Sequence, residues 1–279
     1  MKCKCIFILL SCFIAFALGG ALAQAQTITF GVYTSDKPTE MYRKFGPIVQ
    51  YLQGRLIKNK QDAQIKIKIY PSYTAAIDAL VDGDCDFVRF GPASYITAKD
   101  RNSKVRLLVM EHKKNVKRFK GVFITRKNSP LSSIRELKGK TFAFGNKTST
   151  IGRYLCQAAL VNVGIHADDL KSYAYLGRHD KVALAVAMGN YDAGVVKENT
   201  FKKYSEIKGL KALGTFQNIT KPWVVRAGFP GTLFQILQEA MLQLTDKKIL
   251  KTLKQDGFLK TTDADYAFVR KGMAISKGF

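Results

Sequence analysis

The loop at residues 145–152 is the first candidate for chemistry in this sequence, because it places three hydroxyls between a predicted strand and a predicted helix. It reads Gly-Asn-Lys-Thr-Ser-Thr-Ile-Gly and contains Thr148, Ser149 and Thr150. Backbone N–H groups at a helix start lie where the helix dipole is positive, and they bind phosphate-like or carboxylate anions. The alternative is that Ser149 or Thr150 only caps the helix. We expect the three hydroxyls to contact a small anion.

The same loop lacks the pattern of a nucleotide-binding P-loop. Six residues separate Gly145 from Gly152, and Arg153 stands in place of the Lys-Ser/Thr pair of that motif. Nucleotide hydrolysis is therefore not predicted.

Further candidates lie at strand ends in the first half of the chain. Thr34, Tyr73 and Tyr95 each follow a predicted strand closely, and Arg89 lies within the last of these strands. An arginine can hold two oxygens of an anion with its guanidinium fork, although Arg89 can instead pair with Asp86. In open parallel sheets ligands collect at the carboxyl ends of the strands, so we expect these side chains to share one rim.

His179 and Asp192 form a second group of candidates beyond the loop. His179 can donate a hydrogen bond to an oxyanion, and Asp192 can accept one from an amine or a protonated oxygen. A lone histidine before a helix is otherwise a surface or capping residue. If His179 acts only as an imidazolium, ligand affinity should fall as the pH rises through about 6.5.

An enzyme is not predicted. Ser149, His179 and Asp192 have the residue types of a nucleophilic triad, but no G-x-S-x-G motif surrounds the serine. The sequence contains neither CxxC nor HExxH, so we expect no metal site and no cofactor. Cys85 and Cys156 are expected to be separate buried thiols, the latter packed among apolar neighbours in a helix.

The first 25 residues predict export. Lys2 and Lys4 precede an apolar run at residues 6–18, and Ala23 and Ala25 offer a small-residue cleavage site. This is the pattern of a secretory signal peptide over residues 1–25. An uncleaved membrane anchor is the alternative.

The composition is that of a folded chain with a strong positive charge. Its 279 residues are 47% hydrophobic, which is enough for one large domain or two lobes. The net charge of +24 should attract anions. Basic residues are scattered along the chain and are not interleaved with regularly spaced aromatic residues, which argues against a nucleic-acid partner.

The elements that must position these residues form two successive series. Strand-like and helical segments alternate from residue 28 to residue 110, and the same order begins again at residue 121 and ends near residue 215. The β-α-β order predicts an α/β fold in which each lobe is a mostly parallel sheet with helices on both faces. A strand at 223–226 and an amphipathic helix at 233–244 then return the chain to the first lobe. The ligand is expected in the cleft between the lobes.

Several strings of the sequence resemble the periplasmic solute-binding proteins of phosphate, phosphite and phosphonate importers. In chain order, the matching strings are Gly31-Val32, Ser35-Asp36-Lys37-Pro38, the segment 86–95, Leu137-Lys138-Gly139-Lys140, Ser149-Thr150-Ile151-Gly152, His179-Asp180 and Asp192-Ala193. The resemblance extends, in the same order, over nearly all of the chain after residue 25.

The resemblance implies the two-lobed fold of the second class (type II) of periplasmic binding proteins. Residues 26–118 and 220–279 would form the first lobe, and residues 119–219 would form a second lobe inserted in it. The implied ligand contacts come from both lobes, and they are Tyr73, Tyr95, Ser149, Thr150, His179 and Asp192. Ile151 departs from the family, because it stands where the motif often has a second serine and so removes one hydroxyl donor.

We therefore predict a periplasmic solute-binding protein that closes around a small oxyanion and delivers it to an ABC transporter permease. A ligand that touches both lobes stabilises the closed state. We expect a monomer. Three alternatives remain: a protein read by a membrane sensor kinase, an enzyme that acts on a phosphate or acyl ester, and a protein that attaches to nucleic acid or a membrane surface through its charge.

Overall fold

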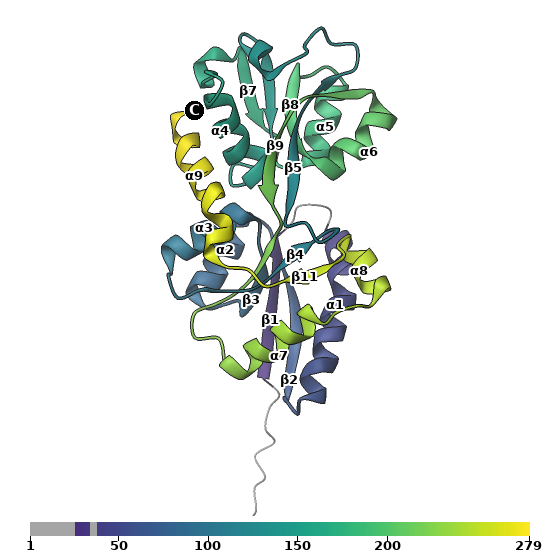
Figure 1. The fold of residues 1–279 in the computed structure, drawn as a ribbon, viewed down its shortest axis with the longest axis vertical. Helices are drawn as coiled ribbons and strands as arrows, with labels where there is room; N and C mark the ends of the chain where they lie inside the picture. The colour runs from purple at the N-terminus through teal and green to yellow at the C-terminus, as the bar shows by residue number, and fades with distance from the viewer. Residues whose placement is uncertain (1–25, 34–37) are drawn as a thin grey trace, which may run out of the picture.

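The protein consists of two β-sheets, each covered by helices, which lie one above the other in Figure 1. The structure is a computed structural model that describes residues 26–33 and 38–279. The expected signal peptide at residues 1–25 and Thr34 lie outside the described residues.

The first lobe is built on a six-stranded sheet with the order β11-β4-β10-β3-β1-β2. In it β1, β2, β3 and β4 run in one direction, and β10 and β11 run in the other. The strands are β1 (Gln26–Tyr33), β2 (Ala63–Tyr70), β3 (Phe87–Arg89), β4 (Arg106–His112), β10 (Pro222–Val225) and β11 (Gly257–Leu259). One face packs on α1 (Pro38–Lys58), α7 (Gly231–Leu242) and α8 (Lys247–Leu253), and the other on α2 (Tyr73–Asp82), α3 (Pro92–Arg101) and α9 (Ala267–Ile275).

The second lobe is built on a five-stranded sheet with the order β7-β6-β8-β5-β9, in which β5 alone of the described strands runs against the others. The two α/β lobes are therefore confirmed. Their sheets are mixed and not mostly parallel, because β10 and β11 in the first sheet and β5 in the second run against their neighbours. The elements are β5 (Arg118–Arg126), β6 (Thr141–Phe144), β7 (Ser172–Tyr175), β8 (Ala193–Lys197) and β9 (Leu210–Ile219), with α4 (Leu155–Val161) on one face and α5 (His179–Ala187) and α6 (Glu198–Lys208) on the other.

Local sequence explains how these elements begin and end. In β2 isoleucines alternate with lysines, so one side faces the core and the other faces water. The helix α2 starts after Ser72, whose side chain accepts a hydrogen bond from the Ala75 N–H. It ends at Gly83, which has a φ of 93° in the left-handed region that favours glycine.

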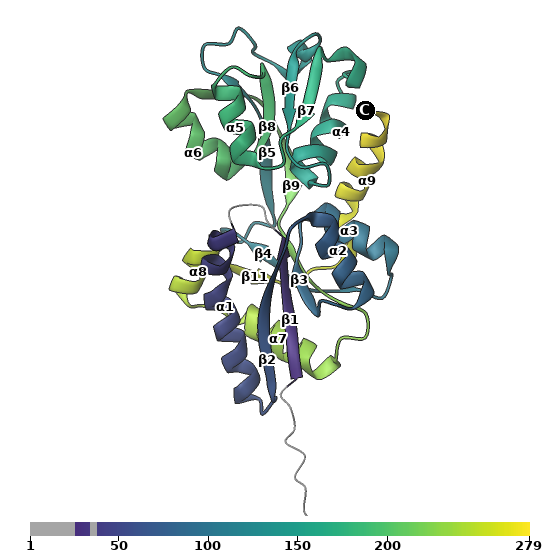
Figure 2. The ribbon, with the colours of Figure 1, turned by 180° about the vertical axis from the view of Figure 1, so that it is seen from behind.

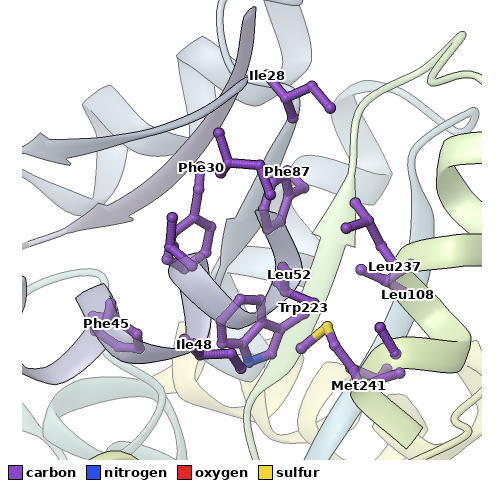
Figure 3. Close-up of a cluster of buried hydrophobic side chains, with 14 of the residues drawn as sticks. Ile28, Phe30, Phe45, Ile48, Leu52, Phe87, Leu108, Trp223, Leu237 and Met241 are labelled. Carbon is purple, nitrogen blue, oxygen red and sulfur yellow. The ribbon is translucent and has the colours of Figure 1, made fainter. Parts of the chain in front are cut away.

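The main core of the first lobe lies between its sheet and α1, α7 and α8 (Figure 3). Trp223 of β10 stacks on Phe30 with ring centroids 4.7 Å apart, and Phe30 stacks on Phe87 at 4.8 Å. Such aromatic pairs contribute about 0.5–1.5 kcal/mol beyond the area they bury. Because Trp223 follows the second lobe in sequence, the first core is completed only when the chain has returned.

Two paired strands carry the chain between the lobes. β5 enters the second sheet and β9 leaves it, and they pair from Arg118 opposite Ile219 to Arg126 opposite Leu210. The second series was expected to end near residue 215. Instead β9 continues to Ile219, and the ring of Phe216 packs against the apolar clusters of both lobes.

The C-terminal segment makes a third connection between the lobes. The helix α9 packs on α3 of the first lobe and on α4 of the second. Phe279 then places its ring against Phe144 and Tyr173, and its carbonyl accepts a hydrogen bond from the Ala167 N–H at 3.1 Å. In Figures 1 and 2, α9 bridges the lobes on one side, and α6 and α8 lie on the other. The end of the chain, expected in the first lobe, thus docks on both.

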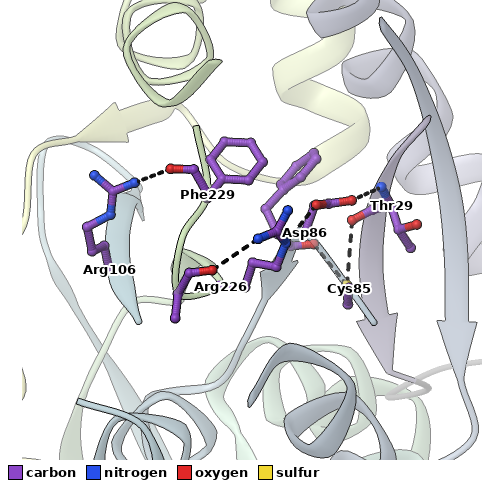
Figure 4. Close-up of polar contacts among 8 residues, drawn as sticks. Thr29, Cys85, Asp86, Arg106, Arg226 and Phe229 are labelled. Carbon is purple, nitrogen blue, oxygen red and sulfur yellow. Dashed lines mark hydrogen bonds and ion pairs between the residues drawn. The ribbon is translucent and has the colours of Figure 1, made fainter. Parts of the chain in front are cut away.

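Asp86 fixes the amino end of β3 (Figure 4). Its carboxylate accepts hydrogen bonds from the Thr29 N–H at 2.8 Å and from Arg226 Nε at 2.9 Å. The Sγ of Cys85 lies 3.5 Å from the Thr29 carbonyl oxygen beside it. Asp86 is therefore paired with Arg226 and not with Arg89, which lies at the other end of the strand.

Candidate functional site

A small cavity lies between the lobes, at the carboxyl ends of strands from both sheets. Its volume is about 50 Å³, and one water molecule needs about 10–15 Å³ on the same measure. The cavity therefore suits a ligand of a few heavy atoms. Its lining comprises Val32, Tyr33, Met41, Tyr73, Arg89, Gly91 and Pro92 from the first lobe, Phe119, Ser149, Thr150, Ile151, His179, Lys197 and Asn218 from the second, and Lys221 at the crossing.

The loop at residues 145–152 closes on itself at its two glycines. The Gly145 N–H donates to the Gly152 carbonyl at 2.9 Å, and a Cβ on Gly145 would lie 2.9 Å from the Cα of Gly152. Ser149 caps the following helix, because its Oγ accepts a hydrogen bond from the Gly152 N–H at 3.0 Å. This helix, expected from residue 152, begins as a wide π-helical turn at Thr150–Tyr154 and continues as α4.

Ser149 and Thr150 line the cavity and keep their hydroxyl hydrogens for a ligand. Ser149 is 6% exposed and Thr150 is 5% exposed. Each oxygen already accepts a backbone N–H, that of Ser149 from Gly152 and that of Thr150 from Ala93 at 2.9 Å. Each hydroxyl can therefore still donate to an anion. Ser149 thus caps the helix and lines the cavity at once.

Two stacked tyrosines form part of the first lobe's wall. The rings of Tyr33 and Tyr73 are 3.9 Å apart at an angle of 25°. The Tyr33 hydroxyl accepts a hydrogen bond from the Gly91 N–H at 2.6 Å, and a Cβ on Gly91 would lie 2.9 Å from that hydroxyl. Burial raises the pKa of Tyr33, so its hydroxyl stays uncharged.

Arg89 lines the cavity, and its guanidinium forms an ion pair with Glu111 of β4. Its Nε and Nη2 lie 2.5 and 2.9 Å from the two carboxylate oxygens, and Trp223 Nε1 donates to the same carboxylate at 3.2 Å. Burial disfavours the ionised carboxylate, but the charge and hydrogen bonds of Arg89 hold the pKa of Glu111 below its usual value. Arg89 is therefore a rigid cation at the end of β3 whose charge is partly neutralised.

Two lysines of the lining were not predicted from the sequence. Lys197 ends β8, and Lys221 lies at the crossing between β9 and β10. Burial lowers the pKa of Lys221 well below its usual value, and the charges of Arg89 and Lys197 act in the same direction while Glu111 opposes them. Clustered cations in a buried cavity are unfavourable unless an anion compensates them. The lining therefore matches an anionic ligand.

His179 lies at the start of α5 and faces the cavity. Its ring hydrogen-bonds the backbone of Val195. Its Nδ1 is buried and has no hydrogen-bond partner among the described residues, so the bond to Val195 uses Nε2. Burial, followed by the charges of Lys197 and Lys221, lowers the pKa of His179 to about 3. The lowered pKa favours a neutral ring over the imidazolium considered from the sequence.

Tyr95 and Thr148 are predicted site residues that the structure does not bring into the lining. Tyr95 is 1% exposed, and its hydroxyl donates to Asp263 at 2.8 Å. It faces the C-terminal segment because it lies on the side of α3 that packs against α9. The Thr148 hydroxyl donates to Asn146 within the loop at 2.7 Å.

Asp192 also lies away from the cavity. Its carboxylate accepts hydrogen bonds from the Thr141 N–H at 2.9 Å and from the Thr141 hydroxyl at 2.8 Å. These residues lie at the amino ends of β6 and β8, whereas the cavity lies at the carboxyl ends. The carboxylate therefore links the amino ends of β6 and β8.

Other lining residues escaped the sequence analysis for different reasons. Tyr33 lies in a strand-end turn of the kind already singled out, so the same signal would have found it. Met41 and Phe119 are apolar and carry no such signal. Asn218 lies within β9, where its 1% exposure depends on the paired strands.

A second and larger hollow opens between α6 and α8. Its volume is about 630 Å³, and its lining comes from both lobes. The helix α6 begins directly after Lys197, so one end of the strand that lines the cavity leads into a helix that lines this hollow. Five lysines line the hollow: Lys113, Lys202, Lys247, Lys251 and Lys254.

The two cysteines of the described chain are structural. Cys85 and Cys156 are buried free thiols, as expected. Burial raises the pKa of Cys85 to about 12 and also raises that of Cys156, so neither is a reactive thiolate. Residues 26–33 and 38–279 contain no cluster of three or more metal-ligating side chains of the His, Cys, Asp or Glu type. No helix in these ranges is long and apolar enough to cross a membrane.

Two α/β lobes joined by paired strands, with a small cationic cavity between them, define a periplasmic binding protein with a site for a small anion. A family profile described as "ABC transporter, phosphonate, periplasmic substrate-binding protein" matches residues 30–266. The chain belongs to this family, whose members bind solutes for transporters and are not enzymes.

Comparison with individual proteins agrees with this assignment. The chain is 29% identical over 159 residues to "Probable ABC transporter phosphite binding protein PhnD1" of Prochlorococcus marinus, and the match spans 54% of this chain but only 53%, about half, of that relative. It is 20% identical to "Phosphate-import protein PhnD" of Mycolicibacterium smegmatis, over 88% of this chain and 84% of the relative. The solved structure of Prochlorococcus marinus PhnD1 with methylphosphonate has a TM-score of 0.80 at 21% identity and covers 91% of this chain and 100% of that one. This likeness establishes the fold.

Proposed function

We propose that this protein captures a small phosphorus oxyanion, namely phosphate, phosphite or a small phosphonate, and delivers it to an ABC transporter permease. The observation that carries the proposal is the cavity of about 50 Å³ between the lobes, which joins the hydroxyls of Ser149 and Thr150 to the cations Lys197 and Lys221. A hydrogen bond to a charged group contributes about 1.5–3 kcal/mol, and a micromolar ligand needs about 8 kcal/mol. A few such contacts therefore suffice.

The relatives support this ligand class, since their printed names refer to phosphite, phosphate and methylphosphonate. The family match favours transport over the sensor-kinase alternative. Ile151 lines the cavity and packs in the core of the second lobe, and Lys197 and Lys221 offset the hydroxyl that it lacks. Of the residues predicted from sequence, we propose as ligand contacts Tyr73, Arg89, Ser149, Thr150 and His179.

The cellular setting follows from the same proposal. Residues 1–25 act as a signal peptide, and the lobes work as a monomer in the periplasm. Closure of the lobes around the anion presents a surface from both lobes to the permease. A ligand that contacts both lobes favours the closed form by its differential contacts.

A thermal-shift screen with calorimetric titration tests the proposal. Phosphate, phosphite and methylphosphonate are compared with arsenic oxyanions and small amino acids, and a ligand at one hundred times its Kd should stabilise the fold by about 2.7 kcal/mol. The Ser149→Ala and Thr150→Ala double variant should lose this shift. Tyr95→Phe, which changes a residue outside the lining, should keep it. Stabilisation by amino acids and by none of the phosphorus oxyanions would contradict the proposal.

A further inference from the structure

Two acceptors in the cavity wall lack partners within the described part of the chain. They are Nδ1 of His179 and Oδ1 of Asn218, and both atoms are buried. A buried acceptor without a donor is unfavourable, because it has given up its hydrogen bonds with water. The pair therefore indicates that the ligand brings hydrogen atoms of its own.

The surroundings of His179 make Nδ1 an acceptor. Its Nε2 donates to the Val195 carbonyl, and a neutral imidazole that donates through one nitrogen accepts through the other. The charged groups that act on the ring are Lys197 at the end of β8, Lys221 at the crossing, and Asp180 on its own helix. Asp180 is paired with Arg178 at 2.8 Å. Burial and the two lysines keep a second proton off the ring.

We propose that the site selects an oxyanion that still carries a proton, whose O–H group donates to His179 Nδ1 or Asn218 Oδ1. The charged oxygens of the ligand then face Lys197, Lys221 and the hydroxyls of Ser149 and Thr150. This inference rests on the proposed capture of a phosphorus oxyanion. A sulfonate or sulfate has a similar tetrahedral shape but no proton near neutral pH. It leaves both acceptors unpaired and brings negative oxygens against their lone pairs.

Ligand pairs of equal charge test this selection. Well below its second pKa, methylphosphonate is a monoanion, as is methanesulfonate, and at higher pH hydrogen phosphate and sulfate are both dianions. In each pair the main difference is one hydrogen atom. Calorimetric titration of the purified protein should give at least about tenfold tighter binding of the phosphorus compound, which equals about 1.4 kcal/mol.

The outcomes separate the inference from the proposed function. Equal affinities within a pair, or tighter binding of the sulfur compound, overturn the selection for a proton while anion capture still holds. If neither these four anions nor phosphite binds, the proposed function fails, and the inference that rests on it fails as well.

Variants locate the selection in the cavity wall. In His179→Ala the preference for methylphosphonate over methanesulfonate should fall, because the phosphonate loses its acceptor and the sulfonate loses an unfavourable neighbour. Ser149→Ala is the matched control, since its hydroxyl donates to either anion and both affinities should drop while the preference remains. A wild-type preference in both His179→Ala and Asn218→Ala would overturn the acceptor role. If a variant does not fold, the affinities of the wild-type protein for the two pairs of anions still test the proposal.

Discussion

The hydroxyl oxygen of Thr150 accepts a hydrogen bond from the Ala93 N–H at 2.9 Å. Thr150 belongs to the second lobe, and Ala93 lies in the first turn of α3 in the first lobe. The bond therefore joins the lobes beside the cavity, while the hydrogen of the same hydroxyl remains for a ligand. Closure and ligand binding thus share one side chain.

Removing this hydroxyl should weaken binding. Thr150→Val keeps nearly the same shape but loses both the bond to Ala93 and the donor to the anion, so the affinity should fall by at least about tenfold. Thr150→Ser keeps the hydroxyl and should stay close to wild type. Calorimetry with the anion that gives the largest thermal shift is the measurement. Unchanged affinity in the valine variant would mean that this loop does not hold the ligand.

Replacing Lys221 should stabilise the empty protein while weakening capture. Lys221→Met removes a partly buried amino group whose positive charge is disfavoured by the nearby charges of Arg89 and Lys197. We expect a gain of about 0.5–2 kcal/mol in the free energy of unfolding without anions, and at least tenfold weaker anion binding. Urea unfolding and calorimetry measure the two effects. Lys247→Met, at an exposed position, is the control and should change stability by less than about 0.5 kcal/mol. A variant that binds as well as wild type would argue against Lys221 as an anion contact.

His179 should make the empty protein sensitive to acid. Its pKa is about 3 in the folded state and about 6.5 when unfolded, so below about pH 6.5 the unfolded state binds a proton that the folded state does not. The free energy of unfolding should then fall by up to about 1.4 kcal/mol per pH unit. Urea unfolding between neutral and mildly acidic pH should show a shallower decline in His179→Gln. Parallel curves for the two proteins would disagree with a buried neutral ring.

The contribution of the Arg89–Glu111 pair to stability should also be lost in acid, but at a lower pH than the effect of His179. The pKa of Glu111 is lowered in the folded state, so its contribution is present above the unfolded value of about 4.3 and is lost as the pH falls through the folded value. Glu111→Gln should cost about 3–5 kcal/mol at neutral pH, because it leaves the Arg89 charge buried and uncompensated. The difference from wild type should shrink in acid.

An exposed ion pair provides the comparison for this experiment. Glu40→Gln breaks a contact with Arg43, in which the two side chains are 48% and 75% exposed. It should cost less than about 1 kcal/mol at neutral pH. If the two substitutions lowered the free energy of unfolding equally, the buried pair would contribute no more to stability than the exposed pair.

Much of the fold could be predicted because its signals are local. The β-branched runs and helical spacings indicated both sheets and the return strand at Trp223. The helix α6 was missed, because Glu198–Lys208 is mostly polar and shows little periodicity. The extension of β9 to Ile219 was also missed, since it depends on pairing with β5.

The site was predictable only in part, for a geometric reason. Ser149 and Thr150 lie in one short loop whose composition indicates an anion site. Asp192 was expected there too, but sequence alone did not show that it lies before β8, at the far end of the sheet from the cavity. The cluster of Arg89, Lys197 and Lys221 forms only when strands from the two lobes meet.

The attachment of α9 and Phe279 to both lobes has a consequence for how a solute gets in. The larger hollow, which five lysines line, lies between α6 and α8, on the side of the molecule away from α9. We expect anions to enter from that side. Anions approaching it are drawn inward by its field, so the association rate should fall steeply with ionic strength, while the dissociation rate, which is set by contacts inside, should change little.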